Sequence, residues 1–348
     1  MPPGADPQSG YAGMSQSTPT DDRPGPDRIP PSRRPRWWLA VIAGCSAVWG
    51  TIPLLIRRVD PVPVQLPGIS AAYDAAPVLI VFWRVVVATA LMAGFIAFRR
   101  GLTAAFSLEK RTLSGLALNG ALLSLHWFLF FSALTMTEVA VAELLTFTGP
   151  VYVAALTPVV LKERFDQRVL LPIAVSLAGM ALVLGPGSIR LDEPRSLAGA
   201  GMALAAAIVF AFLMLNAKRL LRDVPSSIVV FWEALVAALL LLPLVLALPG
   251  FADTDGWIAG ITLGLVHSGL VAFAFLTALR HVRADHAAVL MYVEPVAAVF
   301  LAAAFLGEPL TLSTVVGGAA VVTGGVMVAR LAQTPSAEVP VASSGIQG

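Results

Sequence analysis

Long apolar runs recur along this chain between two polar ends. Ten runs between residues 37 and 330 are each close to the roughly 20 residues that an α-helix needs to cross about 30 Å of hydrocarbon. Because lipid cannot satisfy exposed backbone groups, each run is predicted to be helical. We therefore predict an all-α integral membrane protein with ten transmembrane helices, and nine is the competing count because the fifth run is short. The predicted spans are 37–56, 77–98, 113–134, 138–161, 168–185, 196–217, 226–248, 257–279, 285–306 and 311–330.

The two ends of the chain have a different composition. Residues 1–36 contain nine prolines and few large apolar side chains, and residues 331–348 are similarly polar. Such segments cannot bury enough apolar surface to fold. Both are predicted to be disordered tails.

Composition supports a membrane protein. Hydrophobic residues make up 57% of the chain and charged residues 13%, against about 25% charged residues in a soluble domain. The expected surroundings are therefore a lipid bilayer. A net charge of +2 is too small to indicate a nucleic-acid partner, and the lone Cys45 excludes an intramolecular disulfide and a cysteine-built zinc site.

Lys and Arg near the span ends predict the orientation. If the N-terminus is cytoplasmic, sixteen of these residues lie on the cytoplasmic side and four on the outer side. Cytoplasmic loops carry an excess of Lys and Arg. The expectation is a multi-pass protein of the cytoplasmic membrane with both termini inside. The outer four are Arg57, Arg58, Arg190 and Arg195.

The two halves of the chain resemble each other. Residues 37–185 and 196–330 each hold five predicted spans, and an odd number of spans makes the second copy enter the membrane from the opposite side. We therefore predict two inverted five-helix repeats. The matching positions are Pro150 with Pro295, Glu163 with Glu308, Gly179 with Gly324, Val81–Arg84 with Val230–Glu233, and Arg57-Arg58 with Lys218-Arg219.

Several short motifs follow this pattern in order. They are Trp49-Gly50, Phe82-Trp83-Arg84, His126, Gly149-Pro150, Lys162-Glu163-Arg164, Glu294-Pro295 and Gly307-Glu308-Pro309-Leu310. With these motifs, residues 37–330 resemble the drug/metabolite transporter superfamily, EamA type. Phe147–Pro150 and Met291–Pro295 are similar to its threonine/homoserine exporter branch, which has an acidic residue where this chain has Thr146. The resemblance implies a secondary transporter that exports small metabolites, such as amino acids, by alternating access.

Polar residues inside the predicted spans are the candidate site. Arg84 is costly in a membrane unless it is paired or hydrated, so we expect it to bind an anionic substrate group or to pair with Glu143. Glu143, Thr146 and Pro150 share one face of the fourth span. Pro150 and Pro295 each remove a helical hydrogen bond, and paired helix breaks point to a binding site at the midplane. The alternative for the prolines is helix packing alone.

Glu294, Glu143 and His126 are the candidate proton-coupling groups. Glu294 lies midway along the ninth span, where an ionised carboxylate is expensive. His126 is a histidine within the third span, and histidine titrates near physiological pH. For each of these, a hydrogen-bonded structural role is the alternative. Trp49 and Tyr292 are added as candidate aromatic walls of the substrate site.

Other functions have weaker support in the sequence. The chain lacks the phosphate loop of ATP-driven pumps and the familiar metalloprotease and serine-hydrolase motifs, so we expect neither an enzyme nor a bound cofactor or metal. A channel usually builds its pore from several subunits. An exporter of cationic or apolar drugs is the main alternative to a metabolite exporter. Glycines of the last span, including Gly324 and Gly325, suit close helix packing and also a homodimer face.

Overall fold

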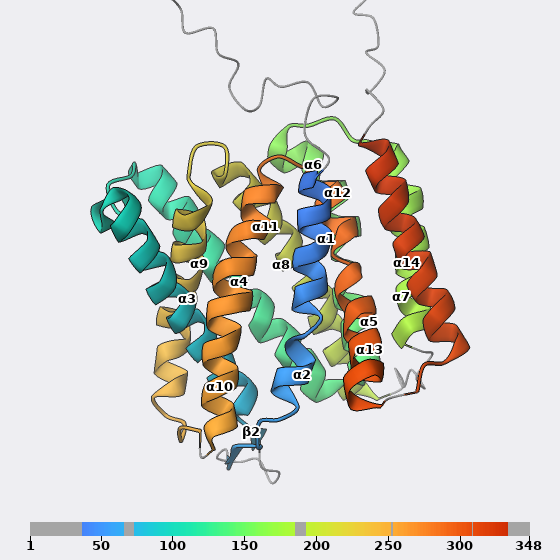
Figure 1. Ribbon diagram of the computed structural model, residues 1–348, viewed down its shortest axis with the longest axis horizontal. Helices are drawn as coiled ribbons and strands as arrows, with labels where there is room; N and C mark the ends of the chain where they lie inside the picture. Colours follow the sequence, from blue (N-terminus) through green and yellow to red (C-terminus); the bar gives the residue numbers. More distant parts are fainter. Residues whose placement is uncertain (1–36, 66–72, 185–192, 252, 308, 333–348) are drawn as a thin grey trace, which may run out of the picture.

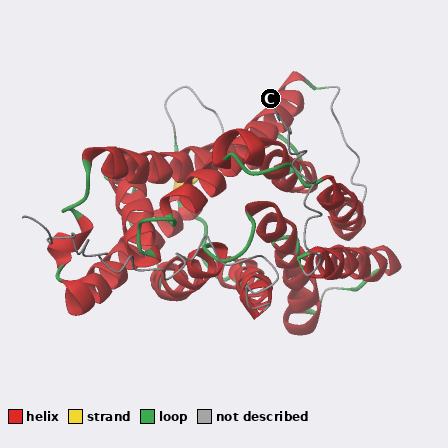
Figure 2. Cartoon of the chain, turned by 90° about the horizontal axis from the view of Figure 1, so that it is seen from above, coloured by secondary structure: helices red, strands yellow, loops and turns green. Residues whose placement is uncertain are grey.

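The computed structural model describes residues 37–65, 73–184, 193–251, 253–307 and 309–332. The predicted tail 1–36 and nearly all of 331–348 lie outside these residues, as do Arg190 and Glu308. Helices account for almost all of the described chain (Figure 2). A single two-stranded antiparallel pair in the described part joins β1 (Pro63–Val64) to β2 (Tyr73–Asp74).

Ten helical segments in the described part are long and apolar enough to cross a membrane. The predicted all-α fold class and the count of ten are therefore confirmed. Span 1 is α1 (Trp37–Trp49) with α2 (Ile52–Ile56), span 2 is α3 (Ala76–Arg100), span 3 is α4 (Lys110–Met136), span 4 is α5 (Val139–Thr146) with α6 (Gly149–Leu161), and span 5 is η4 (Gln167–Val169) with α7 (Leu170–Leu184). Span 6 is α8 (Pro194–Leu220), span 7 is α9 (Ser226–Val245), span 8 is α10 (Thr254–Thr262), η5 (Leu263–Val271) and α11 (Ala272–Leu279), span 9 is α12 (Ala284–Leu290) with α13 (Val293–Leu306), and span 10 is α14 (Leu312–Leu331). A short 3-10 turn, η3 (Leu102–Ala105), follows span 2.

Successive spans run in alternating directions between two ends of the molecule. One end, which we call the terminal end, holds the start of α1 and the end of α14 (top in Figure 1). Contacts at the terminal end join α1 to the connection between spans 8 and 9: Trp38 stacks on His281 with ring centroids 4.4 Å apart. We call the opposite end the mouth end. There the start of α8 contacts the end of α4, because Arg195 Nη2 donates to the carbonyl of Thr135 at 2.9 Å.

These contacts give the directions of the first span of each half. The span of α1 starts at the terminal end, whereas that of α8 starts at the mouth end. Opposite directions for equivalent spans are what an inverted repeat requires. The inverted repeat itself stays a prediction.

Spans 5 and 10 form a separate pair at one edge of the molecule (Figure 1). Their backbones touch because small residues meet there: a Cβ on Gly179 would lie 2.6 Å from the carbonyl oxygen of Gly317, and one on Gly324 would lie 2.9 Å from that of Pro172. Each contact is the counterpart of the other when residues 145 apart are matched. Glycine lets two helices approach this closely in a membrane. The other eight spans form most of the cavity wall, to which span 5 adds only its last residue, Leu184.

Candidate functional site

A cavity of about 1080 Å³ lies between spans 1, 2, 3, 4, 6, 7, 8 and 9. It reaches the mouth end, where the exposed side chains of Arg57, Asp74, Thr135 and Arg195 line it. Among the residues that the structure describes, its lining includes none from the connections at the terminal end. The cavity is therefore open at the mouth end. Aromatic side chains form much of its wall, namely Trp49, Trp127, Phe130, Phe131, Phe147, Phe210 and Phe275.

Two breaks in the helices face this cavity. Span 4 is interrupted between Thr146 and Gly149, and span 9 between Leu290 and Val293. Pro150 and Pro295, each in the first turn after its break, both line the cavity. Proline lacks the amide hydrogen that would continue the helix. The predicted paired breaks are thus present at matching positions of spans 4 and 9.

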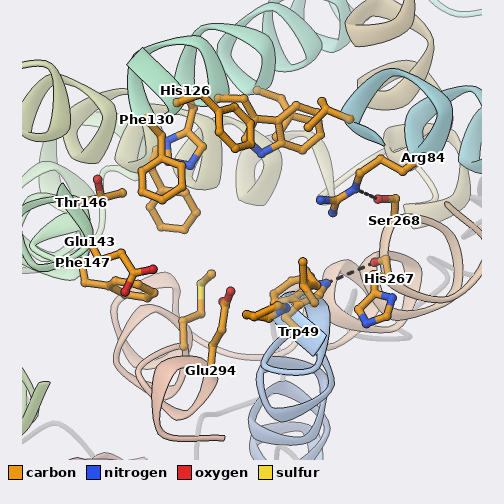
Figure 3. Close-up of a pocket in the computed structure, with 18 of the residues that line it drawn as sticks. Trp49, Arg84, His126, Phe130, Glu143, Thr146, Phe147, His267, Ser268 and Glu294 are labelled. Carbon is orange, nitrogen blue, oxygen red and sulfur yellow. Dashed lines mark hydrogen bonds between the residues drawn. The ribbon is translucent and has the colours of Figure 1, made fainter. Parts of the chain in front are cut away.

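Arg84 enters the cavity from span 2 (Figure 3). Its Nε donates to Ser268 Oγ at 2.8 Å, and its guanidinium carbon lies 5.3 Å from the centre of the Trp127 ring. An Arg over an aromatic face gains a favourable cation–π interaction. The alternative expected from the sequence, an ion pair with Glu143, is not formed among the described residues. A hydroxyl and a ring hold the guanidinium instead, so its charge stays available to a ligand.

Two carboxylates face Arg84 across the cavity. Glu143 projects from α5 and Glu294 from α13, on the side of the cavity opposite Arg84 (Figure 3). Glu294 interacts electrostatically with both Arg84 and Glu143. Thr146 Oγ1, which also belongs to the lining, is buried without a hydrogen-bond partner in the described part of the chain. The site thus offers positive charge on one side, and negative charge with a polar hydroxyl on the other.

Three further residues predicted for the site differ in how they meet the cavity. His126 lines it and is held by a hydrogen bond between its Nδ1 and the Ala206 carbonyl at 3.0 Å. Trp49 lines it, and its Nε1 donates to the carbonyl of His267 at 3.2 Å. Tyr292 is not among the lining residues: it is fully buried, and its hydroxyl donates to the carbonyl of Phe147 at 2.8 Å. In this conformation Tyr292 supports the break of span 4 from behind and does not face the cavity.

Sequence reasoning missed Ser268, the partner of Arg84, and the π-helix η5 that carries it. A π-helix forms where one residue is inserted into an α-helix, often at a functional site. The signal in the sequence is a change of register between the halves. Matching residues of spans 3 and 8 are 145 apart after η5, as in Phe130 and Phe275, but Gly120 and Gly264, which make equivalent contacts at the start of η5, are 144 apart.

A second polar cluster reaches the cavity from spans 3, 6 and 7. Glu233 lines the cavity and accepts a hydrogen bond from Asn119 Nδ2. Asn119 in turn accepts from Asn216 Nδ2 at 2.8 Å, and that group also donates to the Gly115 carbonyl at 3.0 Å. Hydrogen bonds of this kind offset the cost of burying a carboxyl group. The cluster holds Glu233 at the position that matches Arg84 in the other half.

Many lining positions of the two halves correspond. With the sequence pairs given above, spans 1–4 match spans 6–9, and many lining residues of one half match a lining residue of the other half. This is expected if a repeat surrounds the cavity. The matched lining pairs include Trp49 with Phe210, Arg84 with Glu233, Trp127 with Ala272, Phe130 with Phe275, Thr146 with Met291 and Pro150 with Pro295.

Comparison with known proteins decides the family. The EamA-like transporter family profile matches residues 36–185 and again 197–330, most of the chain. The chain belongs to the EamA-like transporter family. An uncharacterised transporter of Archaeoglobus fulgidus is 28% identical over 62% of this chain and 74% of the relative. The uncharacterised transporter YxxF of Bacillus subtilis is 27% identical over 66% of this chain and 73% of the relative.

A solved structure shares the fold. One crystal structure superposes with a TM-score of 0.70 over 86% of this chain and 99% of that chain, at 18% sequence identity. At this identity the likeness shows the fold alone. With the family match and ten apolar helices, the protein is a multi-pass membrane transporter of the EamA family.

Proposed function

We propose that this EamA transporter exports small zwitterionic metabolites, amino acids in the first instance, by alternating access. The observation that carries the proposal is that the Arg84 guanidinium and the Glu294 carboxylate face each other across one cavity. An α-carboxylate suits Arg84, because guanidinium binds carboxylate with two parallel hydrogen bonds. The ammonium group suits Glu294 or Glu143.

The helix breaks add further contacts for such a substrate. A broken helix exposes backbone groups that an intact helix would satisfy internally, and transporters use these groups to bind charged substrates. Both breaks line the cavity, at Thr146 to Pro150 and at Met291 to Pro295. The Thr146 hydroxyl, which has no partner in the described part, suits a hydroxylated side chain such as that of threonine or homoserine.

A second candidate substrate class rests on a different observation. The cavity has a volume of about 1080 Å³, which is more than one amino acid fills, and much of its wall is aromatic. Pockets for drug-sized ligands commonly span about 300–1,000 Å³ and are lined mainly by apolar and aromatic side chains. Export of cationic or apolar drugs is therefore the competing proposal, with Glu294 and Glu143 as partners of the cation.

Counterflow in proteoliposomes separates the two proposals. Vesicles preloaded with unlabelled compound are tested for uptake of the same labelled compound, using the standard amino acids, homoserine, organic cations and nucleobases. We expect exchange of at least one amino acid that carries both an α-carboxylate and an α-ammonium group. Exchange of organic cations without any amino acid would contradict the proposal and favour drug export.

A further inference from the structure

The terminal end of the cavity is closed by Lys218, at the end of span 6. Its Nζ donates to three backbone carbonyls at the end of span 8 and just after it: those of Leu279 at 2.7 Å, Arg280 at 3.0 Å and Val282 at 2.9 Å. The last carbonyls of a helix have no partner within it and carry the negative end of its dipole, so a cation is favoured there. Leu279 is also a lining residue. One buried ammonium group therefore fastens span 6 to span 8 directly beneath the cavity.

Other contacts at the terminal end surround this bond. Arg222 Nη2 donates to the Leu161 carbonyl at 3.3 Å, and Arg280 Nη2 donates to the Arg222 carbonyl at 3.1 Å. Beside them, Asp166 accepts from Arg168 at 2.9 Å, which lowers the pKa of the Asp166 carboxyl below its usual range. Lys218 differs from these side chains in its burial, since it is only 7% exposed. It is the contact that borders the cavity itself.

Each group of the Lys218 contact has a counterpart at the open end. Lys218 matches Arg57 in the repeat, and the three acceptor residues match Leu134, Thr135 and Thr137 at the end of span 3. Arg57, Leu134 and Thr135 all line the mouth of the cavity. The Thr135 carbonyl already accepts a hydrogen bond from a guanidinium, that of Arg195. The mouth thus has a cation and a set of helix-end carbonyls at the sequence positions that match Lys218 and its acceptors.

Packing between the spans supports this matching independently of sequence. A Cβ on Gly120 would lie 2.6 Å from Cβ of Val236 and 3.1 Å from the Glu233 carbonyl oxygen. A Cβ on Gly264 would lie 2.5 Å from Cβ of Val87 and 2.9 Å from the Arg84 carbonyl oxygen. Spans 3 and 7 therefore meet as spans 8 and 2 do. Because the two halves pack in equivalent ways, each half could take up the conformation that the other half has now. Such an exchange would open the terminal end and close the mouth end.

We propose that Lys218 and Arg57 are the two latches of the transport cycle. Lys218 closes the terminal end in the present state, and Arg57 closes the mouth in the alternate state by donating to the carbonyls of Leu134, Thr135 and Thr137. Arg57 is engaged elsewhere in the open state and exchanges that partner on closing. The proposal rests on alternating access, but not on which substrate is carried.

The test measures which end is open, without substrate. In purified full-length protein with Cys45→Ala, a maleimide in detergent reaches both ends. Val139→Cys reports the mouth, because Val139 lines the cavity and is 58% exposed. Ala284→Cys reports the terminal end, because Ala284 matches Val139 and is 0% exposed. In the otherwise unchanged protein, Val139→Cys should react much faster than Ala284→Cys.

Lys218→Met should shift the ratio of the two labelling rates toward Ala284→Cys by on the order of tenfold, because hydrogen bonds from a charged group are lost in one state only. Lys218→Arg should keep most of the original ratio. Arg219→Met and Arg58→Met, which remove exposed neighbouring charges, are the matched controls and should leave the ratio unchanged.

Adding Arg57→Met to Lys218→Met should move the ratio back toward the original value, since both states then lose their latch. A folding defect would not be reversed in this way. An unchanged ratio in Lys218→Met, or equal acceleration of both reporters, would overturn the role of Lys218. A double variant that behaves as Lys218→Met alone would overturn the role of Arg57. Because no substrate is present, failure of amino-acid counterflow would leave this result intact.

Discussion

In the proposed mode of binding, Arg84 is the residue that binds the carboxylate of the substrate. It is held by Ser268 and by the face of Trp127, and its guanidinium points into the cavity. A charge kept inside a membrane protein at this cost is retained for a function. Glu294 has the complementary charge across the cavity, and it directly precedes Pro295 at the break of span 9.

Proton coupling is tested at Glu294. If this carboxyl group alternates between a protonated and an ionised form, Glu294→Gln should abolish accumulation driven by a pH difference while substrate exchange persists. The physical reason is that glutamine resembles the protonated acid but cannot release a proton. Accumulation in proteoliposomes with and without an imposed pH difference measures this, with Glu143→Gln and His126→Gln compared in parallel. Independence of the pH difference in the unmodified protein would remove the coupling role from all three residues.

Broken and irregular helices gather around the cavity, in spans 1, 4, 8 and 9. The breaks of spans 4 and 9 were predictable because proline leaves a visible mark in the sequence. The break between α1 and α2 was not predicted, although Pro53 in the first turn of α2 marks it in the same way. The π-helix of span 8 was not predicted either, because a single extra residue leaves the apolar pattern unchanged. The same limitation explains why Ser268 was missed and why Tyr292 was expected to face the substrate. Apolar periodicity alone does not say which face of a fully apolar helix points inward.

The pairing of spans 5 and 10 gives a prediction about stability. Gly179→Ala places a Cβ 2.6 Å from the Gly317 carbonyl oxygen and 2.9 Å from Cβ of Ala320. Forcing apart a packed contact costs about 1–3 kcal/mol. We expect a lower midpoint of thermal unfolding in detergent, followed by size-exclusion chromatography of the heated protein. Gly94→Ala is the matched control, since no atom lies within 4 Å of the added Cβ there, and an unchanged midpoint in both variants would contradict the close packing.

For the whole molecule, the described spans alternate between two ends, and the charge pattern predicts which end faces the cytoplasm. The sequence was sufficient for the fold class, the number of spans and the paired breaks, because length and apolarity fix these. The sequence could not show which end of the cavity is open and which is closed. Closure at the terminal end depends on a lysine reaching carbonyls about sixty residues away in the chain, as Lys218 does to Leu279.

Orientation is tested by labelling intact cells with a membrane-impermeant maleimide, again with Cys45→Ala. Thr103→Cys, in the connection between spans 2 and 3, and Asp255→Cys, in the first turn of α10 at the start of span 8, are exposed positions at opposite ends. Because Lys and Arg are retained on the cytoplasmic side, we expect Asp255→Cys to react in intact cells and Thr103→Cys only after permeabilisation. The reverse result would place both termini outside.

The most direct test of the whole account is counterflow of amino acids compared between the unmodified protein and Arg84→Gln. Each exchanged amino acid is paired with the amine that lacks its carboxylate, and Arg58→Gln, an exposed Arg outside the cavity lining, is the control. We expect the unmodified protein to prefer the amino acid over the amine, and Arg84→Gln to weaken amino-acid exchange about 10- to 100-fold, as expected for loss of a hydrogen bond between charged groups. Undiminished exchange by Arg84→Gln, or no exchange of any amino acid by the unmodified protein, would contradict the account.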